Sequence, residues 1–116
     1  MKLCLIVEDM PDQAFVINTM LKTSNVKTIV CHDVPAAMLR YGRWDIDIII
    51  TDIGLPEISG IDLIRMVMEK DKRTQIVVVT AYVQDYDRQA AFNAGANYYL
   101  TKPLMPGDLK RVIDRL

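Results

Sequence analysis

Five short apolar runs lack the alternation of polar and apolar residues that marks half-exposed strands. They are rich in valine and isoleucine and cover residues 3–7, 28–31, 46–50, 76–79 and 98–100. Continuous apolar runs of this length are typical of strands covered on both faces, as in a parallel sheet between two layers of helices. The sequence therefore predicts a five-stranded parallel sheet.

The segments between these runs carry a helical period. Ala14, Ile17 and Leu21 fall at i, i+3 and i+7, and the same spacing recurs in residues 61–68, while residues 90–94 carry a smaller stripe of alanines. Asp33 and Ser59 stand where the N-caps of two helices are expected. Strand and helix thus alternate five times, and the last helix is expected from about Gly107 to Leu116.

This alternation predicts an α/β fold with a doubly wound sheet. Right-handed crossovers and the usual order for such a sheet, 2-1-3-4-5, place strands 1 and 3 side by side at the switch point, where ligands bind. The 116 residues fit a single domain that spans residues 1–116.

Charge and hydropathy exclude several kinds of partner. Fourteen basic and fifteen acidic residues give a net charge of -1, so no cationic field draws the chain to nucleic acid or to a membrane surface. The apolar runs are far shorter than the roughly 18 to 20 residues that cross a bilayer. Acidic residues come too early for a signal peptide, which favours a cytoplasmic protein. Cys4 and Cys31 lie in apolar runs and are expected to be free core thiols.

Three carboxylates follow the two central strands. Glu8 and Asp9 come directly after the first run, and Asp52 comes just past the third. Because adjacent strands are about 4.8 Å apart, these side chains should converge and repel one another. A hard cation with oxygen ligands and room for water relieves such repulsion, and Mg²⁺ suits the site best.

Two more polar residues end strands at the same edge. Thr80 follows the fourth run and Lys102 lies just past the fifth. Taken singly, Asp52 could be a turn residue, Thr80 a strand-end hydroxyl and Lys102 a solvated charge. Taken together they fit a phosphoryl group on a carboxylate, because an ammonium and a metal spread its charge and a hydroxyl donates to it. Asp52 is the central candidate nucleophile.

The segments that carry these residues are LIVEDMPDQ, IIITDIGLPEISGIDLI, VVVTAY and GANYYLTKP. With these four motifs in order over nearly the whole chain, the sequence resembles the response-regulator receiver domain of two-component signal transduction. It is similar to chemotaxis regulators, whose fold is flavodoxin-like, (βα)5.

The resemblance implies a metal site and a phosphate acceptor. Asp52 would accept a phosphoryl group and also ligate Mg²⁺. Asp9 would be a direct ligand, Glu8 a ligand acting largely through water, and Gly54 a ligand through its backbone carbonyl.

The resemblance also implies a switch. Thr80 would be the switch hydroxyl, Tyr99 the switch aromatic and Lys102 the cation, while the small Ala81 gives the phosphoryl group access and Lys102-Pro103 is a cis peptide. Once Asp52 is phosphorylated, Thr80 should move toward the new oxygens. The Tyr99 ring, expected in a more exposed resting position, would then enter the vacated volume.

By the same resemblance, the chain is a phosphorylation-dependent switch rather than a classical enzyme. It would catalyse its own Mg²⁺-dependent phosphorylation and slow dephosphorylation. A sensor histidine kinase or a phosphotransfer protein would supply the phosphoryl group. An output domain or a second copy would dock on the face of the fourth helix, fifth strand and last helix.

Three alternative functions require other residues than this interpretation does. A flavin or nucleotide binder needs glycines after the first strand, whereas residues 8–12 are acidic and lack glycine. A haloacid-dehalogenase-type phosphatase needs an acid two residues after its nucleophile, where this chain has Gly54. A pseudo-receiver, which binds proteins without being phosphorylated, stays open.

Two positions depart from the common family pattern, Gly54 and Tyr98. Since Gly54 offers no side chain to orient water, and Tyr82 is placed to screen the site, the sequence predicts a long-lived phosphoryl group.

Overall fold

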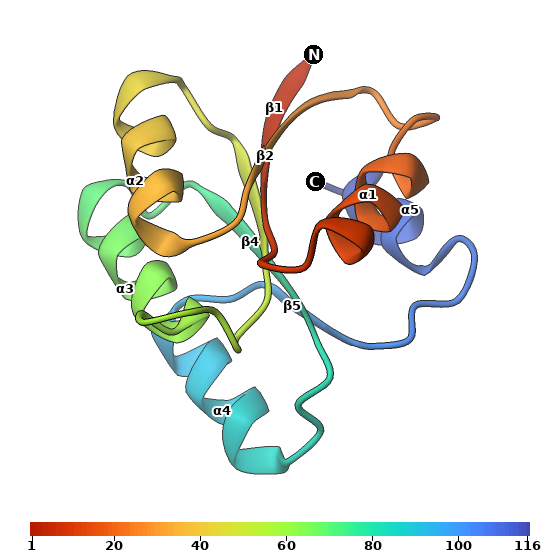
Figure 1. The fold of residues 1–116 in the computed structure, drawn as a ribbon. Coiled ribbons are helices and arrows are strands. Elements are labelled where there is room, and N and C mark those ends of the chain that lie inside the picture. The colour runs from red at the N-terminus through yellow and green to blue at the C-terminus, as the bar shows by residue number, and fades with distance from the viewer.

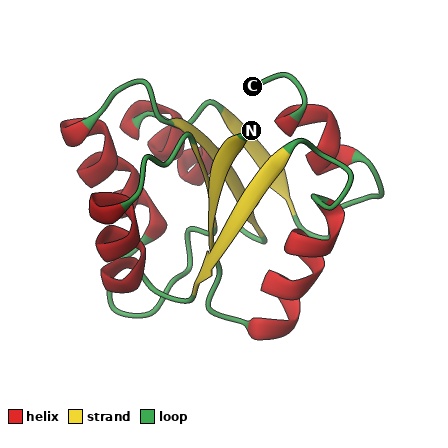
Figure 2. Ribbon diagram, turned by 90° about the horizontal axis from the view of Figure 1, so that it is seen from above, coloured by secondary structure: helices red, strands yellow, loops and turns green.

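The computed structural model describes all 116 residues and shows a parallel sheet with helices on both faces (Figures 1 and 2). The strand order is β2-β1-β3-β4-β5, so the predicted doubly wound α/β fold is confirmed. The strands are β1 (Lys2–Val7), β2 (Val26–Cys31), β3 (Ile48–Thr51), β4 (Gln75–Thr80) and β5 (Tyr98–Thr101). The helices are α1 (Pro11–Met20), α2 (Val34–Arg43), α3 (Gly60–Lys70), α4 (Asp85–Ala94) and α5 (Asp108–Ile113).

The sheet separates two hydrophobic cores. On one face, α2, α3 and α4 pack around a cluster that includes Leu63 and Ile64. On the other face, α1 and α5 pack around a cluster that includes Ile17 and Leu109. The two groups of helices flank the strands in Figure 2. Since both faces are covered, β1, β3 and β4 are apolar nearly throughout, as the five runs predicted.

The structure differs from the sequence prediction at several element ends. β2 begins at Val26, two residues before the expected start, because it is an edge strand and tolerates the exposed Lys27. β3 begins at Ile48, because the preceding Ile46 amide bonds in a turn to the Trp44 carbonyl. α5 covers only Asp108–Ile113, after a left-handed Gly107.

The predicted caps and thiols are confirmed. The Asp33 carboxylate accepts from the Ala36 amide at 2.8 Å, and the Ser59 hydroxyl accepts from the Ile61 amide at 3.0 Å. Cys4 and Cys31 are free and buried, and burial raises the pKa of Cys4 to about 12. None of the helices is long and apolar enough to span a membrane.

Gly60 lets α3 begin against the end of β3. A Cβ atom there would lie 1.8 Å from the Asp52 carbonyl oxygen, and the Gly60 amide donates to the Ile53 carbonyl at 2.9 Å. No side chain fits between these two backbone segments. The glycine therefore fixes the loop that follows Asp52.

We predict that Gly60→Ala lowers the free energy of unfolding by about 1–3 kcal/mol, because the added methyl group overpacks rigid backbone. Gly42→Ala is the matched control, because nothing lies within 4 Å of the added carbon in α2. It should stabilise the protein by about 0.5–1 kcal/mol. Urea unfolding of both variants checks this, and equal midpoints would contradict the close-approach argument.

Candidate functional site

Five predicted site residues lie at the carboxyl edge of the sheet. Glu8 and Asp9 follow β1, Asp52 follows β3, Thr80 ends β4, and Lys102 follows β5. The parallel register pairs Val7 with Thr51, so the next residues of both strands emerge side by side. Strand pairing thus brings Glu8 and Asp52 together, whereas the predicted convergence of Asp9 with these two carboxylates is not seen as a close cluster.

Lys102 connects the two carboxylates of the central strands. Its Nζ lies 2.5 Å from Glu8 Oε1 and 2.8 Å from Asp52 Oδ2. A third bond runs from Nζ to Gln13 Oε1 on α1. Sequence reasoning did not single out Gln13. The available signal was its position four residues before the buried Ile17, which puts a polar residue on the stripe of α1 that faces the sheet.

The charges of this cluster are largely removed from water. The side chain of Glu8 is 1% exposed, that of Asp52 is 11% exposed and that of Lys102 is 18% exposed. Burial raises the pKa of Glu8, although the Lys102 bond opposes the shift. Burial lowers the pKa of Lys102, but hydrogen bonds to Asp52 and Glu8 outweigh it, so this pKa is raised. Lys102 therefore stays an ammonium between its partners at neutral pH.

Backbone amides hold the carboxylates in place. Asp52 Oδ1 accepts from the Gly54 amide at 3.2 Å, and Glu8 Oε2 accepts from the Met10 amide at 3.1 Å. Asp52 Oδ2, which contacts Lys102, is thus on the other side of the carboxylate from the loop. This leaves Asp52 oriented by two different donors.

The donor set suits a hard cation in chemical type. Asp9, Asp52 and the Gly54 carbonyl offer oxygen only, as Mg²⁺ prefers, and Mg²⁺ commonly keeps several waters while binding one or two carboxylates. No group of three or more His, Cys, Asp or Glu residues is gathered closely enough to hold a metal by itself. The residues therefore fit an open, water-rich magnesium site and not a closed protein cage.

Thr80 and Tyr99 are both buried, and both bond to the backbone of Tyr82. The Thr80 hydroxyl accepts from the Tyr82 amide at 3.3 Å, and the Tyr99 hydroxyl donates to the Tyr82 carbonyl at 2.8 Å. The expectation of an exposed resting position for Tyr99 is wrong, since this residue is only 8% exposed. The guanidinium carbon of Arg88 lies 5.0 Å from the centre of the Tyr99 ring, and the Tyr99 hydroxyl already has a hydrogen-bond partner. Both contacts stabilise the buried position of the ring.

The Tyr82 ring occupies the space next to Gly54. A Cβ atom at residue 54 would lie 2.7 Å from the Tyr82 hydroxyl oxygen. The Tyr82 ring therefore lies beside the loop after Asp52. Lys102-Pro103 is cis, as the resemblance implied.

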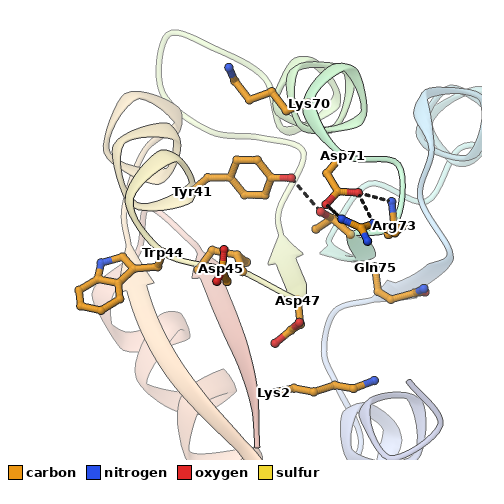
Figure 3. A pocket seen from close by; sticks show the side chains of 11 residues that line it. Lys2, Tyr41, Trp44, Asp45, Asp47, Lys70, Asp71, Arg73 and Gln75 are labelled. Carbon is orange, nitrogen blue, oxygen red and sulfur yellow. Dashed lines mark hydrogen bonds and ion pairs between the residues drawn. The ribbon is translucent and has the colours of Figure 1, made fainter.

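One hollow lies beside this arrangement, and a larger one lies far from it. One, of about 540 Å³, opens beside Lys102 and is lined by Val16, Met20 and Leu104 among others. A larger one, of about 700 Å³, contains none of the predicted site residues (Figure 3). It lies among Lys2, Trp44 and Arg73 at the opposite end of the strands. The predicted site is thus not the largest hollow of the molecule.

Comparisons with known proteins agree with this geometry. Residues 4–114 match the family model described as "Response regulator receiver domain". The chain is 33% identical over 113 residues to an uncharacterized 14.6 kDa protein of Leptolyngbya boryana, covering 96% of this chain and 86% of that protein. It is 30% identical to the transcriptional regulatory protein TrcR of Mycobacterium tuberculosis and 31% identical to the response regulator protein PilR of Pseudomonas aeruginosa. The two matches cover 97% and 94% of this chain but only 42% and 24% of those two proteins.

Solved structures share the fold. The receiver domain of the sensor histidine kinase PA1611 from Pseudomonas aeruginosa, with a magnesium ion coordinated in its active site cleft, has a TM-score of 0.88 at 30% identity. The match covers 98% of this chain and 95% of that one. A CheY-like receiver domain protein from Methanospirillum hungatei has a TM-score of 0.93 at 23% identity, covering 99% and 92%. Since the family model spans nearly all of the sheet and its polar edge, this chain belongs to the response regulator receiver domains of two-component systems.

Proposed function

We propose that this chain is a phosphorylation-dependent signalling switch in which Asp52 accepts a phosphoryl group from a histidine kinase or a phosphotransfer protein. The observation that carries this proposal is the Lys102 ammonium, 2.8 Å from Asp52 Oδ2 and 2.5 Å from Glu8 Oε1. A pseudo-receiver has no use for a buried cation that bridges these two carboxylates. Removing a buried ion pair from water costs free energy, so such a pair is weak evidence for a role in stability alone.

The transfer needs little covalent chemistry from the protein. An Asp52 oxygen attacks the phosphorus of a phosphohistidine, and an O–P bond forms as the N–P bond breaks. The imidazole nitrogen keeps the electron pair of the broken bond, and Asp52 becomes an acyl phosphate. Lys102 and Thr80 then lie where they can pair with the new oxygens, so catalysis is mostly positioning and charge stabilisation.

Mg²⁺ would be held by Asp9, Asp52 and the Gly54 carbonyl, with Glu8 acting largely through water. When bound, it would offset the negative charge that a phosphoryl group brings to three carboxylates. The chain would thereby promote its own phosphorylation without being a classical enzyme.

The output face would be the surface of α4, β5 and α5, where an output domain or a second copy docks. Val83 and Tyr86 are 62% and 72% exposed near the start of α4. These apolar side chains support a protein partner there. The net charge of -1 gives no support for direct binding to nucleic acid or to a membrane.

Asp52→Asn should abolish phosphorylation, because the amide is not a nucleophile. Wild type incubated with acetyl phosphate and Mg²⁺ should gain the mass of one phosphoryl group, and a chelator should prevent this. Asp45→Asn, at the opposite edge of the sheet, is the matched control and should react like wild type.

Asp9→Ala should weaken Mg²⁺ binding more than Glu8→Ala, since a direct ligand is lost. Labelling of Asp52→Asn, or an unlabelled wild type, would overturn the proposal and favour a pseudo-receiver.

We predict a long-lived acyl phosphate, because Tyr82 covers Gly54 and no side chain orients a water molecule. Gly54→Asn displaces the Tyr82 hydroxyl from the loop after Asp52. Tyr82→Glu replaces the aromatic ring with a carboxylate that can accept a hydrogen bond from a water molecule. Each should speed hydrolysis, because a positioned water molecule reacts faster than a randomly oriented one. Loss of the phosphorylated mass over time measures the rate. Decay that is unchanged or slower in both variants would refute the screening role.

Thr80→Ala should leave Asp52 able to react but separate it from the output face. In wild type, beryllofluoride with Mg²⁺ should shift the amide signals of Ala90, Tyr99 and Leu109, because Thr80 moves and releases the Tyr82 amide. In the variant these shifts should shrink, while signals beside Asp52 still change. Equal shifts in both proteins would show that Thr80 is not the relay.

A further inference from the structure

We propose that Gln13 is a positioning residue that holds the Lys102 ammonium against Asp52 during phosphoryl transfer. This inference rests on the proposed function, in which Asp52 is the acceptor. Gln13 touches Lys102 and neither Asp52 nor any of the proposed metal ligands by a hydrogen bond. It would therefore act through the lysine.

The geometry leaves no N–H group of the ammonium without an acceptor. A lysine ammonium carries three N–H groups. In this structure they meet Glu8 Oε1, Asp52 Oδ2 and Gln13 Oε1. The first two acceptors follow strands and the third comes from α1, so the helix closes the coordination of the cation. Removing the third acceptor would leave a largely buried N–H group unpaired and free to pull Lys102 elsewhere.

The neutral charge of Gln13 matters as much as its reach. Glu8 and Asp52 already place two carboxylates against one ammonium. A third carboxylate at this ammonium, from α1, would oppose the approach of a phosphoryl group, whereas an amide oxygen accepts the bond without added charge. The amide is itself oriented, because Gln13 Nε2 donates to Met10 Sδ at 3.2 Å. The oxygen of Gln13 is thus turned toward Lys102.

Of the three contacts of the ammonium, the reaction alters only the one to Asp52. When Asp52 becomes an acyl phosphate, its charge moves onto the phosphoryl oxygens and its bond to Lys102 must change. Glu8 alone would draw the ammonium toward β1. The Gln13 bond opposes this pull, so Lys102 stays facing the phosphoryl group.

The test compares Gln13→Met, which has similar length and no oxygen, with Gln13→Glu, which keeps an oxygen acceptor. Thr19→Ala, an exposed position on the same helix, is the control. Three readouts apply to each protein: the rate of phosphorylation by acetyl phosphate, the Mg²⁺ affinity from amide shifts, and the ¹H–¹⁵N signal of the Lys102 ammonium, which survives only when hydrogen bonds slow its exchange. Gln13→Met should lose the ammonium signal and react about tenfold more slowly at unchanged Mg²⁺ affinity. Gln13→Glu should keep the signal, and Thr19→Ala should match wild type throughout.

If wild type is phosphorylated and Gln13→Met matches it in rate and in ammonium signal, the positioning role is wrong. If wild type itself is not phosphorylated, the proposed function fails. Loss of the signal only in Gln13→Met would then still support the contact, and retention would overturn it. Loss of the signal in Gln13→Glu would also overturn it, because that variant still offers an acceptor oxygen.

Discussion

The parallel pairing of β1 with β3 is the constraint on which the rest of the site depends. Val7 pairs with Thr51, and the Asp52 amide donates to the Val7 carbonyl at 3.2 Å. This pairing forces Glu8 and Asp52 to leave the sheet at the same level. Because both strands are buried on both faces, a slip of one residue would bring polar groups into the cores. The apolar packing of the sheet therefore fixes the distance between the carboxylates.

Many features of the fold and several of the site follow from the sequence, and the failures have physical reasons. Strands β1, β3 and β4 are central, so burial on both faces leaves an unbroken apolar pattern in the sequence. The edge strand β2 lacks that constraint, and its first residues were missed. The contact of Gln13 depends on how α1 lies relative to the segment after β5 that carries Lys102, which no local pattern encodes. The burial of Tyr99 was missed because a tyrosine on an edge strand gives no sign of whether a helix covers it.

The Lys102 ammonium explains how two largely buried carboxylates, Glu8 and Asp52, can lie close together. Lys102 takes one oxygen of Glu8 and one of Asp52, while backbone amides take the others. Burial still disfavours the charge on Glu8, as its raised pKa shows. The buried negative charge of Glu8 is thus energetically unfavourable, and a divalent cation or a neutralising proton would make it less so. Metal affinity at such a site comes partly from relief of this cost.

Tyr82 connects the loop after Asp52 with the ends of β4 and β5 through three separate groups. Its ring lies against Gly54, its amide bonds to Thr80 and its carbonyl accepts from Tyr99. A movement of Thr80 toward a phosphoryl group removes the acceptor of the Tyr82 amide, and the same backbone segment carries the partner of Tyr99. A shift of this segment would also displace the ring that lies against Gly54. The access of water to Asp52 and the position of Tyr99 beside α4 are therefore coupled, because one residue takes part in both.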